Sequence, residues 1–170
     1  MQTAVQCLSN YLLHIINHND RFSNSQIIPH FHAKTIPSVS VESYLNRIVK
    51  FAPCDPECLL AIIIYLQKLA GKYGLKSLKV YDDTNLVVNS FNIHRLIITS
   101  FTIAVKFLSD TFYTNSHFAK VGGIHVQELN RLELELLLLL DFNLIISPLD
   151  METIELITSI HSDSALDLLE

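Results

Sequence analysis

A lysine near the end of a strongly apolar segment is the first residue whose chemistry needs an explanation. Lys106 lies between Val105 and Phe107 in the stretch 92–110, which reads NIHRLIITSFTIAVKFLSD. An ammonium group taken out of water is costly unless an acceptor comes to it. Lys106 therefore indicates a contact, either with another part of the chain or with a partner.

Two helical lines of side chains combine this cation with a carboxylate. Helical spacing places four residues on one face of the first segment: Ile103, Lys106, Phe107 and Asp110. A similar line on a later segment and just past it holds Glu133, Leu137, Leu140 and Leu144. The result is an apolar stripe with one cation and one anion, and these two charges can pair with each other inside the domain or contact a partner.

Sequence motifs of enzymes are absent. The chain has no Gly-rich phosphate loop, no GxSxG and no HExxH. It has four glycines, of which only Gly122 and Gly123 are adjacent, so no loop can surround a phosphate. Glu133 and Glu135 are two positions apart and point to different faces of a helix, which excludes an acid–base pair. We expect no catalysis by this chain alone and no cofactor.

Three pairs of possible metal ligands are close in sequence. They are His14 with His18, His30 with His32, and Cys54 with Cys58. No acidic or cysteine partner stands at ligand spacing beside either histidine pair, and the cysteines lack a second ligand pair. We expect structural or exposed roles for the histidines, small apolar roles for the cysteines, and no metal.

Composition favours a globular domain that binds other proteins. Hydrophobic residues make up 49% of the 170 residues and charged residues only 17%, so the surface should keep apolar area that a partner could cover. Residues 1–131 hold all 12 bases and eight of the acids, whereas residues 132–170 hold nine acids and no base. The acidic end can attract basic segments or be a solvated face, and no basic stripe suggests nucleic-acid binding.

The number of cysteines and the lengths of the apolar runs indicate the cellular compartment. Three cysteines are an odd number, the N-terminus does not resemble a signal peptide, and the Leu-rich run at 136–140 is too short to span a bilayer. We therefore expect a reducing compartment, cytoplasmic or nuclear, and no membrane association.

Periodic apolar residues between glycines and prolines predict an all-α fold. The β-branched runs lie inside windows of helical period that are longer than ordinary strands. Asp55, Pro56 and Glu57 form a strong helix start, with a cap, a proline at the first position and an acid in the first turn. Helices are expected at about 3–17, 40–53, 56–71, 92–110, 115–121, 126–140 and 150–160.

The segment 92–110 should be the central helix. Its apolar residues go nearly all the way round, which is typical of a helix covered by others on every side. Asn92 is suited to cap its first turn, and Ser109 and Asp110 close it.

Several sequence blocks resemble the cyclin family, and within it the phosphate-regulon (P/U-type) cyclins. The blocks are YLNRIVKF, IIIYLQKLA, FNIHRLIITSFTIAVKF and TNSHFAKVGGIHVQELNRLELELLLLLDFNL, in the order and spacing of that cyclin box. The resemblance implies a single five-helix box over 35–146. An N-terminal helix and extended loop, 1–34, would precede the box, and a short acidic helical extension, 147–170, would follow it.

The resemblance also implies a partner and a set of contacts. Cyclins bind and activate cyclin-dependent protein kinases, and the box lysine and glutamate that bond around the kinase's regulatory helix match Lys106 and Glu133. Three further residues match the apolar contacts beside them: Phe107, Leu137 and Phe142. Protein substrates or inhibitors would be additional partners.

Asp110 is expected to be accessible on the same side. Kinases that work with this branch can dispense with activation-loop phosphorylation, so another group must hold an arginine of the loop. A carboxylate can accept a bidentate arginine bond there, and an acid at a helix C-terminus has the wrong sign for a purely local role.

Two features depart from the pattern of better-known cyclins. The family's internal tie between an arginine on the first box helix and an aspartate on the second corresponds here to Arg47 and Gln67, so the charge pair is lost and the acceptor of Arg47 is open. The Met-Arg-Ala-Ile-Leu docking motif is replaced by YLNRIVKF, and no second cyclin fold is expected in the 24 residues that follow Ile146. The alternatives to a kinase regulator are a transcription-factor-like cyclin-fold adaptor and a helical scaffold without a kinase.

Overall fold

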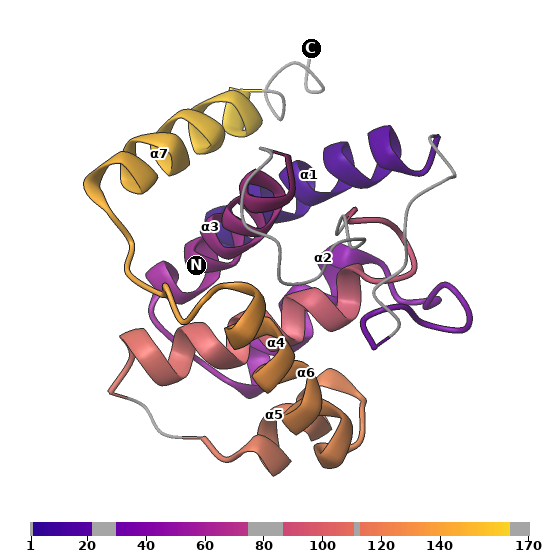
Figure 1. Ribbon diagram of the computed structural model, residues 1–170. Coiled ribbons are helices and arrows are strands. Elements are labelled where there is room, and N and C mark those ends of the chain that lie inside the picture. Colours follow the sequence, from indigo (N-terminus) through magenta and orange to yellow (C-terminus); the bar gives the residue numbers. More distant parts are fainter. Residues whose placement is uncertain (1, 22–29, 75–86, 111–112, 164–170) are drawn as a thin grey trace.

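The computed structural model describes residues 2–21, 30–74, 87–110 and 113–163, and within these ranges every regular element is an α-helix. Figure 1 shows α4 in the middle of the bundle, with α5 and α6 on one side of it and α1 and α7 on the other. The all-α expectation is confirmed. The helices are α1 (Gln2–Asn19), α2 (Val41–Phe51), α3 (Pro56–Gly74), α4 (Ile93–Leu108), α5 (Asn115–Gly122), α6 (Val126–Leu139) and α7 (Pro148–Asp163).

Helix α4 is the central element, as its sequence predicts. Every residue from Leu96 to Val105 is buried, and the helix packs against α2, α3, α5 and α6. Two of the buried residues are threonines whose hydroxyl groups donate to main-chain oxygens one turn back, from Thr99 to Arg95 at 2.7 Å and from Thr102 to Ile98 at 2.8 Å. These bonds satisfy the hydroxyls locally, so the helix can be covered on all sides.

The ends of α2, α3 and α5 follow the local signals of the sequence. Ser40 caps α2 by accepting from the amide of Ser43, and α3 begins at Pro56. Gly123 follows α5 in the left-handed conformation, at φ 71°, where glycine carries no steric penalty. The predicted boundaries there are confirmed to within about three residues.

The expected cap of α4 is wrong in its chemistry. Asn92 occupies the cap position, but its side chain makes no bond to the first turn. Its amide oxygen instead accepts from the backbone of Asn89, and its amide nitrogen donates to the carbonyl of Val87 at 2.8 Å. Asn92 therefore fixes the turn that enters α4 and leaves the first turn of the helix uncapped.

The helices outside the five-helix core contact it on one side. Helix α1 packs against α2, α3 and α7, and α7 also packs against α3. Figure 1 shows α1 and α7 at the end of the molecule away from α5 and α6. No helix in the described ranges is both long enough and apolar enough to cross a membrane.

Gly122 is required by the close approach of α5 to α4. A Cβ atom at this position would lie 2.6 Å from Cγ1 of Ile98. We expect Gly122→Ala to destabilise the fold by about 1–3 kcal/mol, because overpacking exceeds the gain of up to about 1 kcal/mol in helix propensity. Chemical denaturation measures the change.

The matched control for this prediction is the same substitution in an Ile98→Ala background. Removing the Ile98 side chain removes the clash, so there Gly122→Ala should cost little or be stabilising. An equal cost in both backgrounds would show that the close contact is not the cause.

Candidate functional site

The ends of α4 and α6 meet through a charge pair. Nζ of Lys106 lies 2.6 Å from Oε1 of Glu133, and the two side chains are 37% and 14% exposed. The amide of Asn115, at the start of α5, donates to the second oxygen of Glu133 at 2.7 Å and to the side-chain oxygen of Asn130. Glu133 is thus held from two sides, by the last turn of α4 and the first turn of α5.

This geometry corrects the expected burial of Lys106. The buried part of α4 ends at Val105, and Lys106, Phe107 and Leu108 are all exposed. The ammonium group pairs with Glu133 inside the chain, which is the internal alternative weighed from the sequence. A lysine ammonium has three donors, and the side chain of Lys106 is 37% exposed, so the pair with Glu133 uses only part of its donor capacity.

Apolar side chains around this pair are unusually exposed. Phe107 is 50% exposed and Phe142 is 60% exposed, whereas Leu137 packs partly against the core. Other large apolar residues on or near α6 were not singled out from the sequence: Leu134, Leu138 and Ile145. Leu134 and Leu138 lie opposite the buried Leu132 and Leu136 on the helical wheel, and this spacing was the available signal for them.

The turn that presents Phe142 has an uncommon backbone. Asp141 and Phe142 both have positive φ, at 51° and 55°. Left-handed backbone costs a residue with a side chain about 1–2 kcal/mol, and the exposed Phe142 ring recovers little of this by burial. The amide of Phe142 donates to the carbonyl of Leu137 at 2.9 Å, which closes α6 tightly.

Two side chains of α3 hold the chain that follows this turn. The ammonium of Lys68 donates to the carbonyls of Asn143 and Ile145, and the hydroxyl of Tyr65 donates to the carbonyl of Leu144 at 3.3 Å. These contacts join residues more than 70 positions apart, so no local sequence pattern announces them. They make Phe142 part of a fixed turn.

Asp110 is accessible, as expected, but its place differs from the sequence interpretation. Helix α4 ends at Leu108 with Ser109 as its cap, so Asp110 lies beyond the helix and not on its face. Its residue surface is exposed. Helical spacing therefore does not place the Asp110 carboxylate on the same face as Lys106.

The structure does not bring Arg47 and Gln67 together. The amide nitrogen of Gln67 donates to the hydroxyl of Tyr11 on α1 at 3.2 Å. The guanidinium of Arg47 instead lies over the ring of Tyr44, 5.0 Å from its centroid. The family's arginine–aspartate tie between the first two box helices is therefore not replaced by an Arg47–Gln67 bond, because Gln67 faces α1.

The histidines and cysteines have separate surroundings. His30 lies 2.8 Å from Glu135, and His32 stacks on Phe91. Cys54 and Cys58 are both free thiols. Across the ranges that the structure describes, no three or more histidine, cysteine, aspartate or glutamate side chains gather in a way that could hold a metal ion.

Comparison with known proteins agrees with this architecture. A sequence model described as Cyclin matches residues 3–144. The chain is 45% identical over 122 residues to the PHO85 cyclin-like protein psl1 of Schizosaccharomyces pombe, covering 72% of this chain and 46% of that protein. It is 46% identical over 123 residues to PHO85 cyclin-7 of Saccharomyces cerevisiae, covering 72% of this chain and 43% of that protein.

A plant relative is matched over more of its length. The chain is 38% identical over 152 residues to Cyclin-U4-1 of Arabidopsis thaliana, covering 87% of this chain and 70% of that protein. The chain thus spans less than half the length of the two yeast relatives and about two thirds of the plant one. The family model covers most of the chain, including the bundle around α4, and the relatives are P/U-type and PHO85 cyclins, so this chain belongs to the cyclin family.

Proposed function

We propose that this chain is a regulatory subunit that binds and activates a cyclin-dependent protein kinase of the PHO85 type. The observation that carries the proposal is the Lys106–Glu133 pair, set among exposed apolar side chains. By the resemblance to cyclins, these positions match the family's kinase contacts. The names of the two yeast relatives give the type of kinase. The chain supplies binding energy, and the catalytic residues are those of the kinase.

Activation follows from differential affinity. A kinase is active when its regulatory helix sits inward and the Lys–Glu pair that holds ATP is formed. A subunit that binds the inward state more tightly than the outward state shifts the kinase towards activity. The Phe142 turn and the Glu133 cluster are formed in the free chain, so little ordering opposes binding.

The internal pairing of Lys106 is compatible with a partner contact. Glu133 orients the ammonium, and the remaining donors can bond carbonyl groups at the end of the kinase's regulatory helix. Asn115 keeps Glu133 in place through its other oxygen. The pair thus acts as a preformed donor group whose desolvation on binding is partly offset by its own acceptor.

Asp110 has the position and charge to order the kinase's activation loop. Its carboxylate is exposed just past α4, near the Lys106 end of the helix. An arginine of the loop can bond it in a bidentate manner, as it would a phosphate but with about half the charge.

Lys106→Ala and Glu133→Ala should weaken kinase binding by roughly 2–5 kcal/mol, as for other charge pairs buried at an interface. Their effect on folding should stay below about 1 kcal/mol, because the pair is partly exposed in the free chain. Titration calorimetry and thermal melts separate the two effects. Lys120→Ala, which removes an exposed base of α5, is the control. A large fall in stability with unchanged affinity would make the pair purely internal.

Phe142→Ala should cost over about 2 kcal/mol of kinase binding, as expected of an aromatic anchor. Stability should change little, because the ring is mostly exposed and alanine gives up little buried contact. Phe51→Ala is the matched control, since Phe51 is similarly exposed, at 53%, on α2. The assignment fails if both variants bind the kinase as tightly as the parent.

Asp110→Asn should reduce kinase activity far more than kinase binding, because the loop would lose its charged acceptor. The complex should then depend on activation-loop phosphorylation. Activity assays on kinase with an unphosphorylated loop measure this, with Glu42→Gln, an exposed acid of α2, as control. Equal activity of parent and variant complexes would remove Asp110 from the mechanism.

A further inference from the structure

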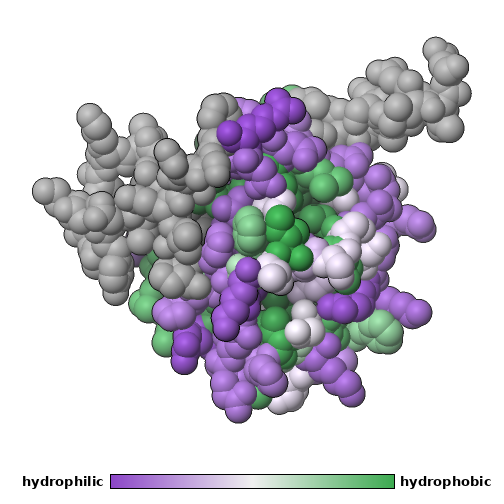
Figure 2. Space-filling view, turned by 90° about the vertical axis from the view of Figure 1, so that its right-hand side faces the viewer, coloured by the Kyte–Doolittle hydropathy of each residue, from purple (hydrophilic) through white to green (hydrophobic). Residues whose placement is uncertain are grey.

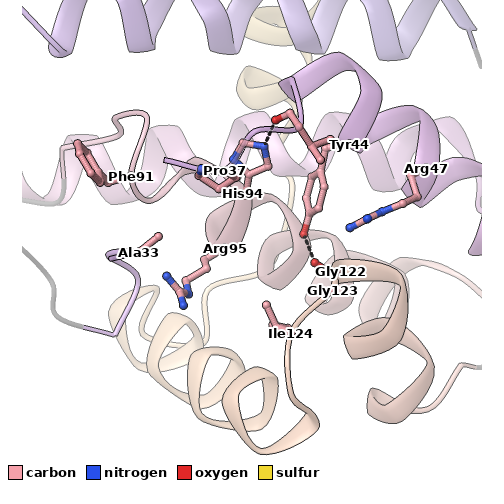
Figure 3. Close-up of a pocket in the computed structure, with 11 residues that line it drawn as sticks. Ala33, Pro37, Tyr44, Arg47, Phe91, His94, Arg95, Gly122, Gly123 and Ile124 are labelled. Carbon is pink, nitrogen blue, oxygen red and sulfur yellow. Dashed lines mark hydrogen bonds between the residues drawn. The ribbon is translucent and has the colours of Figure 1, made fainter. Parts of the chain in front are cut away.

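A cavity of about 280 Å³ lies between the loop before α2, the helix α2, the start of α4 and the turn from α5 to α6. Figure 3 shows Tyr44, His94, Arg95 and Arg47 around it. Figure 2 views the side of the molecule on which the loop before α2 lies in Figure 1, and apolar side chains there form a central strip among hydrophilic ones. Four apolar residues also line the cavity: Pro37, Val39, Phe91 and Ile124. Gly122 and Gly123 line it from the turn between α5 and α6.

Arg47 reaches this cavity without an acidic partner among the described residues. Its guanidinium lies over the Tyr44 ring and close to Gly123, where an added Cβ would be 3.3 Å from Nη2. Its buried Nε has no hydrogen-bond partner, and no acid in the described part of the chain pairs with it. The residue that should provide its acceptor by family resemblance is Gln67, which bonds Tyr11.

The other polar groups of the cavity are neutral or already balanced. Arg95 is paired with Glu128 through Nε and Nη2, both 2.7 Å from Oε1. Nε2 of His94 lies 2.8 Å from the carbonyl oxygen of Val39, and burial lowers the pKa of His94, so its ring is uncharged at neutral pH. The Tyr44 hydroxyl donates to the carbonyl of Gly122 at 3.0 Å, and burial raises its pKa. These groups leave one net positive charge, that of Arg47.

Unused hydrogen-bonding capacity in the same place indicates a ligand. Nη1 of Arg95 and Nε of Arg47 are buried donors without a hydrogen-bond partner among the described residues. Nδ1 of His94 is also buried and unpartnered, but because Nε2 donates to Val39 it is an acceptor and does not bind an anion. Buried polar groups are almost always satisfied, so two unpartnered donors beside one cavity need an explanation. The planar fork of an arginine without an acidic partner fits a carboxylate through two parallel bonds.

The net charge of the cavity and its apolar walls define the class of ligand. One net positive charge matches a monoanion, whereas a phosphate group carries about −1.5 to −2 at neutral pH. Pro37, Val39, Phe91 and Ile124 offer apolar surface beside the arginine. A ligand with an apolar body and a single carboxylate satisfies both requirements.

We propose that this cavity binds such a carboxylate, with Arg47 donating hydrogen bonds to its charged end and the apolar walls covering its body. The carboxylate can belong to a free acid or to an acidic side chain flanked by apolar residues in a peptide. The site does not depend on the proposed kinase function, since none of its residues is among the kinase contacts.

The test uses the whole chain and needs no kinase. Hexanoate is titrated into labelled protein while the backbone amide signals of Tyr44, His94 and Gly123 are followed by NMR, with hexanamide as the uncharged analogue of equal shape. Saturable shifts with hexanoate, and at least tenfold weaker ones with hexanamide, are expected. No saturable response to either the acid or the peptide described below would overturn the proposal.

Variants tie the response to Arg47. Arg47→Met should weaken hexanoate binding at least tenfold, and Arg47→Lys should fall between it and the parent, because lysine keeps the charge but loses the fork. Lys50→Met, on the exposed side of the same helix, should bind like the parent. Equal hexanoate binding by Arg47→Met and the parent would refute the site. If Arg47→Met fails to fold, the comparison of hexanoate with hexanamide on the parent protein still tests the proposal.

Two further arms identify the source and the class of anion. An acetylated Leu-Glu-Leu amide peptide and its Leu-Gln-Leu counterpart distinguish a peptide-borne carboxylate from a free acid. Tighter binding of the glutamate peptide than of hexanoate supports a peptide-borne carboxylate. Tighter binding of hexanoate supports a free acid. Inorganic phosphate or sulfate that shifts the same amides at lower concentration than both carboxylates would overturn the carboxylate assignment.

Discussion

The requirement that α4 be covered on every side sets the positions of the other box helices. A helix that is buried continuously from Leu96 to Val105 cannot lie on a surface, so α2, α3, α5 and α6 must all contact it. The same constraint explains where the candidate site lies. Burial stops after Val105, and the last turn of α4 emerges with Lys106 and Phe107 exposed beside the ends of its neighbours.

The exposed end of α4 is suited to binding a partner because the side chains around it are already held in place in the free chain. Asn115 and Lys106 hold opposite oxygens of Glu133, and side chains of α3 hold the turn that presents Phe142. That turn has two residues with left-handed backbone and an exposed aromatic ring, which costs free energy in the isolated chain. Strain that persists under such contacts is typical of a functional surface.

The short helix α5 connects the two candidate sites of this protein. Its first residue, Asn115, bonds Glu133, and its last residue, Gly122, lines the cavity that Arg47 enters. Eight residues of helix place these ends only about 10 Å apart along the axis. Helix α5 therefore contributes a residue to each candidate site, and its Gly122 end is packed against α4 without room for one added methyl group.

The sequence by itself determined the helices, their order and the central role of α4, because periodic burial and local caps are encoded within each segment. It also pointed to Lys106, Glu133 and the exposure of Asp110, since charges in or near an apolar stripe are visible as pattern. Only the tertiary structure decided which partners these groups find: Asn115 for Glu133, Tyr11 for Gln67, and a cavity for Arg47. Such contacts join distant segments, and they depend on the directions in which packed helices turn their side chains, which helical spacing alone does not specify.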